Sequence, residues 1–352
     1  MPLEEPGWWY PRPGAAPLPL PARLLGPFEA LYGWAVERRF RTTAPYRARL
    51  PVVCIGNFTA GGTGKTPLSR FLLARLNAEG VTPACLTRGY GGALTGPVWV
   101  EADRHTAADA GDEPLLLALD ARVMLARDRP AGLKAIEAEA EIGAVIMDDG
   151  LQNPTVAKDL SIAIVDARRG FGNGHIIPVG PLRAALEFQL GLVDCIVVMG
   201  DDPPDADTSS VFEDLKKRFH GPVLRGHVGA SDDDASWIAG ANVIAYAGIA
   251  NPERFFRLVE SFAPERLSRR TYKDHHAFTE QEAASLLADA AAQGATLLTT
   301  EKDDARLSGT TGALAELKAR SRTLPIAVSF EERDLLRLYS LIEGTIKAVA
   351  KP

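Results

Sequence analysis

The sequence contains few cysteines, and none is placed as a cross-link or a metal ligand would be. Only three occur in 352 residues: Cys54, Cys85 and Cys195. Each sits inside an apolar, strand-like run, without the short spacings of a cysteine metal site. This pattern argues against a disulfide framework. It predicts buried thiols in a protein of the reducing cytoplasm.

Long apolar runs and an excess of basic charge are also missing. The N-terminal region has no stretch of about 18 uncharged apolar residues, because Arg23 and Glu29 interrupt it. Neither a membrane-spanning helix nor a signal peptide is therefore expected. A net charge of −6 argues against a general nucleic-acid binder, which is usually basic. The content of 46% hydrophobic and 24% charged residues is that of a globular protein, here long enough for two domains.

The first 45 residues differ in character from the rest. Residues 1–27 contain eight prolines and the cluster Trp8-Trp9-Tyr10. Residues 21–50 contain six arginines and two glutamates, a local charge of +4. We predict that residues 1–45 form an amphipathic segment on an anionic membrane surface, with Trp and Tyr at headgroup level. The alternative is an ordinary helix packed on the protein, its arginines in solvent. Apolar side chains recur at helical spacing at Leu24, Phe28, Leu31, Tyr32 and Ala35.

A glycine-rich turn, GNFTAGGTGKTP from Gly56 to Pro67, is the most informative stretch. It follows an apolar run and precedes a helical pattern that starts near Lys65. A strand, a glycine turn and a helix N-terminus in that order form a phosphate-binding loop, because backbone N–H groups and the helix dipole attract anionic oxygens. Lys65 is expected to reach the β- and γ-phosphates, and the Thr66 hydroxyl to bind Mg²⁺. The residues predicted to bind ATP are Thr59, Ala60, Gly61, Gly62, Thr63, Gly64, Lys65 and Thr66.

The loop is a variant, since the strict motif has glycine at the position of Thr59. The alternative interpretation is a turn whose glycines are only structural.

Short β-branched runs alternate with helical patterns, as in a parallel sheet with crossover helices. We predict an α/β fold: a P-loop NTPase-type parallel-sheet domain over residues 46–222 and a smaller α/β domain over 223–330 that closes over the active site. Thr279 and Glu282 form a capping box for a helix of the smaller domain. A final helix, within residues 331–352, is expected to pack back on one of the domains. The predicted strands are Val52–Ile55, Ala84–Thr87, Ala144–Asp148, Ser161–Asp166, Cys195–Met199, Val243–Ala247 and Thr296–Thr300.

Two acids at the end of a predicted strand, Asp148 and Asp149, are the second strong indication of a nucleotide site. A carboxylate at such a position lies beside a P-loop and holds the metal of the nucleotide, directly or through water. Neighbouring residues of an extended chain point to opposite sides, so the two acids are expected to have different functions. Both are predicted, with Thr66, to bind Mg²⁺. The alternative is a strand that ends in an Asp-Asp-Gly turn.

Other polar residues have two interpretations each. Asp112 and Glu113 precede a leucine-rich helix, where a carboxylate either complements the helix dipole or accepts a hydroxyl proton during phosphoryl transfer. His275, in Asp274-His275-His276, either orients a catalytic group or is structural. Arg88 and Arg183 lie in glycine-rich turns and either bind a phosphate or remain in solvent.

Together these segments resemble one family, the tetraacyldisaccharide 4′-kinases, which phosphorylate a lipid A precursor in Gram-negative bacteria. The family's P-loop commonly has Ser or Thr at the position of Thr59. The resemblance extends from about residue 8 to residue 305. It is carried, in order, by the Trp-Tyr-Pro start, the amphipathic helix, GNFTAGGTGKTP, TRGYGG, GDEPLLLA, DDGLQ, DARRGFGNG, GPLR, GIANPERFF, DHHAFT and TTEKD.

The resemblance implies transfer of the γ-phosphoryl group of ATP, with Mg²⁺, to the 4′-hydroxyl of a lipid-linked glucosamine disaccharide 1-phosphate. By position, Asp112 resembles the base that takes the hydroxyl proton, His275 resembles its partner, and Lys65 acts with them. Arg88 and Arg183 are expected to face the anionic substrate. The implied partners are the lipid A disaccharide precursor and the anionic inner-membrane surface, on its cytoplasmic face. No nucleic acid and no obligatory protein partner is expected.

The chain departs from the family at two places. The family usually continues DDGLQ with His, where this chain has Asn153, and commonly reads PLREP, where this chain has Ala184 and Ala185 after Arg183. These differences bear on substrate contacts rather than on phosphoryl transfer. Two other functions stay open: a membrane-associated P-loop ATPase switch that binds a protein partner, and a soluble P-loop ligase or small-molecule kinase.

Overall fold

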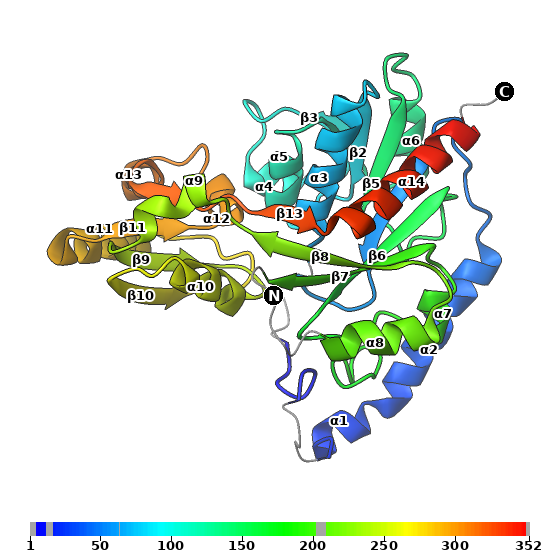
Figure 1. The fold of residues 1–352 in the computed structure, drawn as a ribbon, viewed down its shortest axis with the longest axis horizontal. Helices are drawn as coiled ribbons and strands as arrows, with labels where there is room; N and C mark the ends of the chain where they lie inside the picture. Colours follow the sequence, from blue (N-terminus) through cyan, green and yellow to red (C-terminus); the bar gives the residue numbers. More distant parts are fainter. Residues whose placement is uncertain (1–4, 12–16, 63, 202–208, 350–352) are drawn as a thin grey trace.

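The computed structural model describes residues 5–11, 17–62, 64–201 and 209–349. Its larger part is built on a nine-stranded sheet with the strand order β13-β8-β7-β6-β1-β5-β2-β4-β3 (Figure 1). The two edge strands, β3 and β13, are antiparallel to their neighbours, and all other pairs are parallel. The strands are β1 (Val52–Asn57), β2 (Pro83–Thr87), β3 (Val98–Val100), β4 (Arg122–Leu125), β5 (Ala144–Asp148), β6 (Leu160–Asp166), β7 (Cys195–Asp201), β8 (Val223–Gly229) and β13 (Ala327–Phe330).

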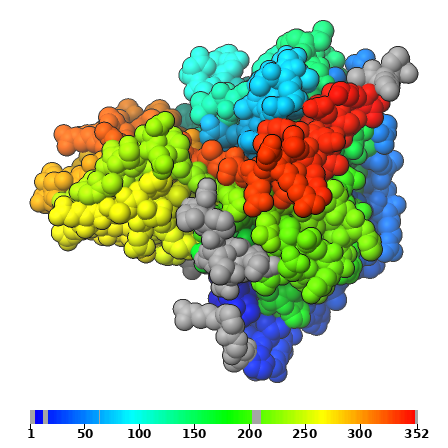
Figure 2. Space-filling view, viewed as in Figure 1, coloured from blue at the N-terminus to red at the C-terminus, as the bar shows by residue number. Residues whose placement is uncertain are grey.

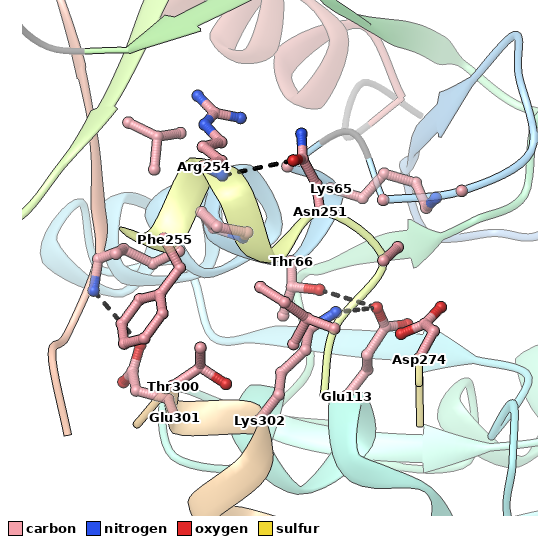
Figure 3. A pocket seen from close by; sticks show the side chains of 18 of the residues that line it. Lys65, Thr66, Glu113, Asn251, Arg254, Phe255, Asp274, Thr300, Glu301 and Lys302 are labelled. Carbon is pink, nitrogen blue, oxygen red and sulfur yellow. Dashed lines mark hydrogen bonds and ion pairs between the residues drawn. The ribbon is translucent and has the colours of Figure 1, made fainter. Parts of the chain in front are cut away.

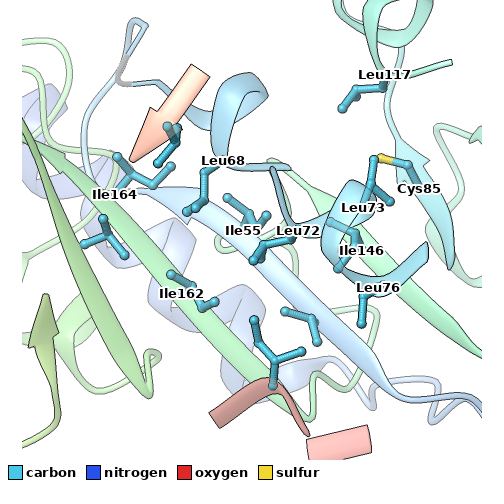
Figure 4. Packing of buried hydrophobic residues seen from close by; sticks show 14 of the residues in the cluster. Ile55, Leu68, Leu72, Leu73, Leu76, Cys85, Leu117, Ile146, Ile162 and Ile164 are labelled. Atoms are coloured by element: carbon cyan, nitrogen blue, oxygen red, sulfur yellow. The ribbon is translucent and has the colours of Figure 1, made fainter. Parts of the chain in front are cut away.

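Helices cover both faces of this sheet because its central strands are apolar on both sides. Strands β1, β5 and β6 are buried along their whole length, as expected for a parallel sheet between two helical layers. On one face, α3 (Lys65–Ala78) packs Leu68, Leu72 and Leu76 against strand residues such as Ile55 and Ile146 (Figure 4). Helix α14 (Glu332–Val349) joins the same layer.

The opposite face of the sheet is covered by α6 (Arg129–Ile136), α7 (Leu186–Leu190) and α8 (Ser209–Arg218). The three cysteines are buried free thiols within these layers, which confirms the prediction. Burial raises the pKa of Cys54 to about 11, so this thiol is not a reactive group at neutral pH.

The smaller part is a four-stranded parallel sheet in the order β10-β9-β11-β12, and it projects from one end of the larger part (Figures 1 and 2). Its helix α11 begins at the predicted capping box of Thr279 and Glu282. Its elements are β9 (Asn242–Ala247), β10 (Arg266–Thr271), β11 (Thr296–Thr299), β12 (Ser321–Thr323), α9 (Asp232–Ala235), α10 (Pro252–Ser261), α11 (Glu280–Gln293), α12 (Glu301–Arg306) and α13 (Gly312–Arg320).

The boundary between the two parts differs from the predicted one. The sequence places residues 223–330 in the smaller domain, but β8 extends the large sheet beside β7, and β13 pairs with β8 at its edge. The chain therefore leaves the large sheet after β8 and returns through β13, and the strands of the smaller sheet lie within residues 242–323. The signal for β8 is weak because an arginine and a histidine interrupt its apolar run, VLRGHVG.

At the N-terminal side, α1 (Leu20–Leu24) and α2 (Gly26–Thr42) run along the outside of the larger part (Figure 1). Only Ala22 and Gly33 are buried among their residues. Glu29 connects α2 to the body, because its carboxylate accepts the Ile176 amide at 2.7 Å and lies 3.1 Å from His175 Nδ1. None of the described helices combines the length and the apolar character needed to cross a membrane.

The aromatic cluster that precedes these helices packs on the protein. Trp9 Nε1 donates to the Pro178 carbonyl at 3.2 Å. The ring of Tyr10 lies 4.2 Å from the Arg169 guanidinium, and its hydroxyl donates to the Ala60 carbonyl at 3.5 Å. Trp9 and Tyr10 thus pack on the protein, and their position at headgroup level stays a prediction. Tyr10 links the N-terminal segment to the glycine-rich loop.

Candidate active site

The predicted phosphate-binding loop lies between β1 and α3. Gly61 and Gly64 have φ values of +99° and +91°, a backbone conformation that favours glycine. The Asn57 side chain at the end of β1 holds the loop, since its amide donates to the carbonyls of Thr59 and Gly61. The Asn57 side-chain oxygen accepts from Lys65 Nζ at 3.3 Å. The turn is thus shaped around a buried lysine.

Six of the eight residues predicted to bind the nucleotide line a cleft above this loop: Ala60, Gly61, Gly62, Gly64, Lys65 and Thr66. Thr59 is buried and pairs with Leu182, so it is absent from the described lining. Thr63 lies outside the described residues. The Ala60 amide donates to the Pro181 carbonyl at 2.8 Å, which leaves the amides from Gly61 onward as the candidates for binding phosphate.

The cleft lies between the larger and smaller parts and has a volume of about 730 Å³. The larger part contributes the loop, Glu113 and Asp149, and the smaller part contributes His275. The start of α10, the turn at Asp274 and the start of α12 also come from the smaller part (Figure 3). A cavity at such a junction, at the C-terminal ends of parallel strands, is the usual place for a ligand site in α/β proteins.

Asp148 and Asp149, at the end of β5, have opposite surroundings, in line with the expected difference in function. Asp148 is buried and accepts from Ser69 Oγ at 3.0 Å. Burial, with the charges of Glu113 and Asp149, raises the pKa of Asp148 to about 7. Asp149 lies 3.7 Å from Lys65 Nζ and 3.2 Å from Arg183 Nη1. Although burial opposes it, these two cations lower the pKa of Asp149.

Glu113, at the start of α5 (Asp112–Leu117), joins the loop to the smaller part. Its Oε1 accepts from the Thr66 hydroxyl at 3.3 Å and from Lys302 Nζ at 2.5 Å (Figure 3). Burial alone would raise the pKa of Glu113, but the charges of Lys302 and Lys65 lower it. An ionised carboxylate thus lies beside the Thr66 hydroxyl.

Thr66, Asp148 and Glu113 form a donor set that fits the Mg²⁺ of a bound nucleotide. Such an ion takes one or two carboxylates and completes its shell with phosphates and water. The described part of the chain has no group of three His, Cys, Asp or Glu side chains arranged to hold a metal. Asp149, the other predicted acidic ligand, lies beside Lys65 and Arg183, and its role as a metal ligand stays a prediction.

Asp112 and His275 come from different parts of the chain and meet beside the cleft. His275 Nδ1 lies 3.3 Å from Asp112 Oδ2, and its backbone has a φ of +56°, strained for a non-glycine residue. Arg306 Nε donates to the same Asp112 oxygen at 2.8 Å. His276, next to His275, pairs with Glu282 at 2.9 Å and belongs to the packing of the smaller part.

The charges in this cluster are mutually stabilising. Burial alone would raise the pKa of Asp112, but the hydrogen bond to His275 and the charge of Arg306 lower it. The hydrogen bond to Asp112 raises the pKa of His275. Asp112 is therefore ionised at neutral pH, which a proton acceptor requires.

The two arginines predicted to bind substrate are placed differently. Arg183 donates to the Thr59 carbonyl at 3.1 Å and pairs with Asp149, so in this structure it supports the loop while lining the cleft. Arg88 is exposed at the end of β2 and lines the cleft too. At the positions that depart from the family, Asn153 Oδ1 accepts the Thr155 amide at 2.8 Å, and Ala184 is buried.

Two residues of α12, Lys302 and Arg306, complete the site although the sequence assigned them no role. Lys302 contacts Glu113, and Arg306 contacts Asp112. Their segment follows β11, and a polar run after a strand was the only sequence feature that indicated a site here. This feature does not indicate which acidic residues Lys302 and Arg306 contact.

A glycine-rich loop around a buried lysine lies between a strand and a helix, and acids lie at the end of the neighbouring strand. A second α/β unit lies over the cleft. Together these features define a P-loop phosphotransferase. Comparison with known sequences identifies the family. The family LpxK, tetraacyldisaccharide-1-P 4′-kinase, matches residues 21–342. This chain belongs to that family, as its motifs predicted.

Curated relatives of nearly the same length support this membership. A protein of Rhodospirillum centenum named tetraacyldisaccharide 4′-kinase is 43% identical over 334 residues, covering 95% of each chain. One of Nitrobacter winogradskyi with the same name is 40% identical over 347 residues, covering 98% of each chain. A crystal structure of LpxK from Aquifex aeolicus in complex with ATP matches with a TM-score of 0.70 at 22% identity, covering 93% of this chain and 100% of that one. This likeness confirms the predicted fold.

Proposed function

We propose that this protein transfers the γ-phosphoryl group of ATP to the 4′-hydroxyl of a tetraacyldisaccharide 1-phosphate, a step in lipid A biosynthesis. The observation that carries the proposal is the meeting of Asp112 and His275 at 3.3 Å, beside a cleft lined by the phosphate-binding loop. An ionised carboxylate with an imidazole partner suits the removal of a proton from a hydroxyl group.

In the proposed reaction, the 4′-oxygen bonds to the γ-phosphorus as the bond to the β,γ-bridging oxygen breaks, and ADP leaves. The hydroxyl proton passes to Asp112, which His275 orients. Lys65 and Lys302, one from each part of the molecule, both line the cleft and would face the phosphates. Mg²⁺ at Thr66, Asp148 and Glu113 would neutralise further phosphate charge.

The test is an assay of purified protein with labelled ATP, Mg²⁺ and the acceptor in neutral detergent micelles. We expect ATP consumption that depends on the acceptor and produces a bisphosphorylated lipid, and no product from an acceptor without a 4′-hydroxyl. Lys65→Ala should lose nucleotide binding and turnover together. Hydrolysis that ignores the acceptor would instead support a P-loop ATPase switch.

We further infer that α1 and α2 bind the anionic cytoplasmic face of the bacterial inner membrane. Leu20, Leu24, Phe28 and Leu31 follow helical spacing and are 60–69% exposed, and the arginines of the same segment add positive charge. An apolar stripe with basic neighbours suits an anionic lipid surface. The acyl chains of the acceptor favour such docking, since each buried CH₂ is worth about 0.8 kcal/mol.

Substitution on the stripe tests this inference better than deletion, because deletion would also remove the contacts of Tyr10 and Glu29 with the body of the protein. Phe28→Glu should reduce flotation with vesicles that contain anionic lipid. Leu336→Glu is the matched control, since Leu336 is 60% exposed on α14. Equal flotation of both variants and the wild type would contradict membrane docking through α2.

A further inference from the structure

Ion pairs join the smaller part to the larger part on two sides of the main cleft. On one side, α12 contributes two cations that contact acids of the catalytic cluster. On the other side, α10 contributes Arg254 and Arg257, whose partners lie at the ends of β6 and β7. Both arginines line the cleft. This second side has no part in the reaction described above, although it too joins the two parts.

Arg254 directs all three of its guanidinium nitrogens at the larger part. Nε lies 2.7 Å from Asp201 Oδ1, and Nη2 donates to the Gly200 carbonyl at 2.7 Å. Nη1 lies 3.9 Å from Asp166 Oδ2. These partners are the last residues of β7 and β6. The side chains of Arg254 and Asp201 are only 18% and 24% exposed, so water and salt screen this ion pair less than a surface pair.

Two further arginines converge on the same carboxylate. Arg257 Nη2 lies 3.1 Å from Asp201 Oδ2, and residues three positions apart share one face of a helix. Both oxygens of Asp201 are thus bound by successive turns of α10. Arg168, which follows β6, lies 3.4 Å from Asp201 as well. Although burial opposes it, these arginines lower the pKa of Asp201, so the acid is ionised at neutral pH.

Helix α10 begins directly beside the phosphate-binding loop. Asn251 caps the helix, since its side-chain oxygen accepts the Arg254 amide at 3.3 Å. A Cβ atom on Gly62 would lie 3.4 Å from Ala250 Cβ, so the residue before the cap is in van der Waals contact range of the loop. Asn251 and Arg254 lie at the end of the pocket that contains Lys65 (Figure 3). The contacts of Arg254 therefore fix the smaller part where it meets the loop.

The same helix is connected to the catalytic histidine through β9. Phe256 of α10 is buried in one apolar cluster with residues of β9. Just after β9, the Gly248 carbonyl accepts the His275 amide at 3.0 Å. A shift of α10 relative to the larger part would therefore also move His275 relative to Asp112.

We propose that Arg254 is a positioning residue whose contacts with the ends of β6 and β7 hold the smaller part over the phosphate-binding loop and thereby place His275 against Asp112. The inference rests on the proposed function, in which these two residues act on the acceptor hydroxyl. It adds a requirement on the side of the cleft that does not touch the reacting groups. A misplacement of about 1 Å at the reacting groups can cost about 100-fold in rate.

Kinetics of wild type, Arg254→Gln, Asp201→Asn and the double variant form the first measurement. Arg254→Gln should lower kcat about 10- to 100-fold, with a smaller change in the KM for ATP because the loop itself is unaltered. Arg254→Lys keeps the charge and should restore part of the rate. If Arg254 acts through Asp201, the double variant should lose no more than Arg254→Gln alone.

A distance measurement separates positioning from direct contact with the nucleotide. The three native cysteines are buried, and burial raises the pKa of each thiol, so spin labels should attach to introduced cysteines instead. Lys217→Cys on α8 and Glu265→Cys after α10 place one label on each part at exposed positions. With Arg254 intact we expect one narrow distance distribution, and with Arg254→Gln a broader one.

Arg269→Gln is the matched control. Arg269 pairs with Glu253 and Glu260 of the same helix but lies on β10 within the smaller part, so both kcat and the distance distribution should stay at wild-type values. Should Arg254→Gln fail to fold, Arg254→Lys and Asp201→Asn provide the same comparison.

An unchanged distance distribution in the Arg254 variants would overturn the inference, whatever their kcat. A broadened distribution with wild-type kcat would overturn it as well. A wild-type enzyme that phosphorylates no acceptor would refute the proposed function, whereas the distance measurement would still decide whether Arg254 holds the two parts together.

Discussion

Substitution of Arg306 by glutamine should destabilise the protein and weaken its proposed catalytic base. The Arg306 side chain is 8% exposed and lies between two buried acids, Asp112 and Asp303. Removing one partner of a buried ion pair costs about 3–5 kcal/mol, because the remaining charge stays buried without compensation. Asp112 keeps His275, and Asp303 keeps hydrogen bonds from Thr300 and the Gly248 amide. We therefore expect a loss near the lower limit, about 3 kcal/mol.

The same substitution should move the pH dependence of turnover. Burial alone would raise the pKa of Asp112, and Arg306 is one of the groups that lower it, so its removal should raise that pKa. A base with a higher pKa stays protonated up to a higher pH. The acid limb of the kcat/KM profile should therefore shift to higher pH. Arg306→Lys keeps the positive charge but not the bidentate geometry of the guanidinium group. It should therefore bring the acid limb part of the way back to its wild-type pH.

Stability should respond to pH with a defined sign. The folded pKa of Asp112 is below its unfolded value, so its contribution is complete above an unfolded pKa of about 3.9 and is lost as pH falls through the folded value. The stability difference between wild type and Arg306→Gln should therefore shrink below about pH 4.

Denaturant midpoints and kcat/KM profiles of wild type, Arg306→Gln and Arg306→Lys measure these effects. Arg320→Gln is the control, since this exposed arginine of the smaller part pairs only with Glu316. If Arg306→Gln kept both the wild-type midpoint and the wild-type acid limb, Arg306 could not be the cation that holds Asp112.

Three further predictions concern the large part. Asp112→Ala should lower kcat about 10²- to 10⁴-fold with nucleotide affinity nearly intact in a binding assay; equal loss of both would make Asp112 structural. Glu113→Gln should raise the Mg²⁺ concentration needed for half-maximal rate, and an unchanged Mg²⁺ curve would remove Glu113 from the metal site. Burial and nearby acids raise the pKa of Asp148 to about 7, and a ligand must be deprotonated. Calorimetry should therefore show Mg·ADP binding more weakly at pH 6 than at pH 8, with proton release near pH 7.

The nucleotide loop and the acids at the end of β5 could be predicted because their signals are local. The glycines, Lys65 and Thr66 lie within one short stretch, and hydrophobic residues before Asp148 mark a buried strand. The geometry that requires glycine at Gly61 and Gly64 is built by neighbouring residues. Local backbone rules therefore suffice for this half of the site.

The other half depends on contacts between distant residues. Arg306 meets Asp112 across 194 positions of sequence, and Lys302 meets Glu113 across 189. From the sequence alone, a lysine or arginine after a strand does not indicate which acid it pairs with. The pairing depends on how the smaller part packs against the larger part. The strand β8 escaped prediction for a related reason, since its assignment depends on pairing with β7 rather than on its own pattern.

The contact of Glu29 with His175 and Ile176 has a mechanical consequence. The loop that contains these residues continues to Pro181, Leu182 and Arg183, which pair with the phosphate-binding loop. Helix α2 is therefore connected to the nucleotide site through a continuous series of hydrogen-bonded segments. Docked on a bilayer, α2 would hold the cleft at a defined height and tilt above the headgroups, so the sugar of the acceptor could enter while its acyl chains remain among the lipid tails.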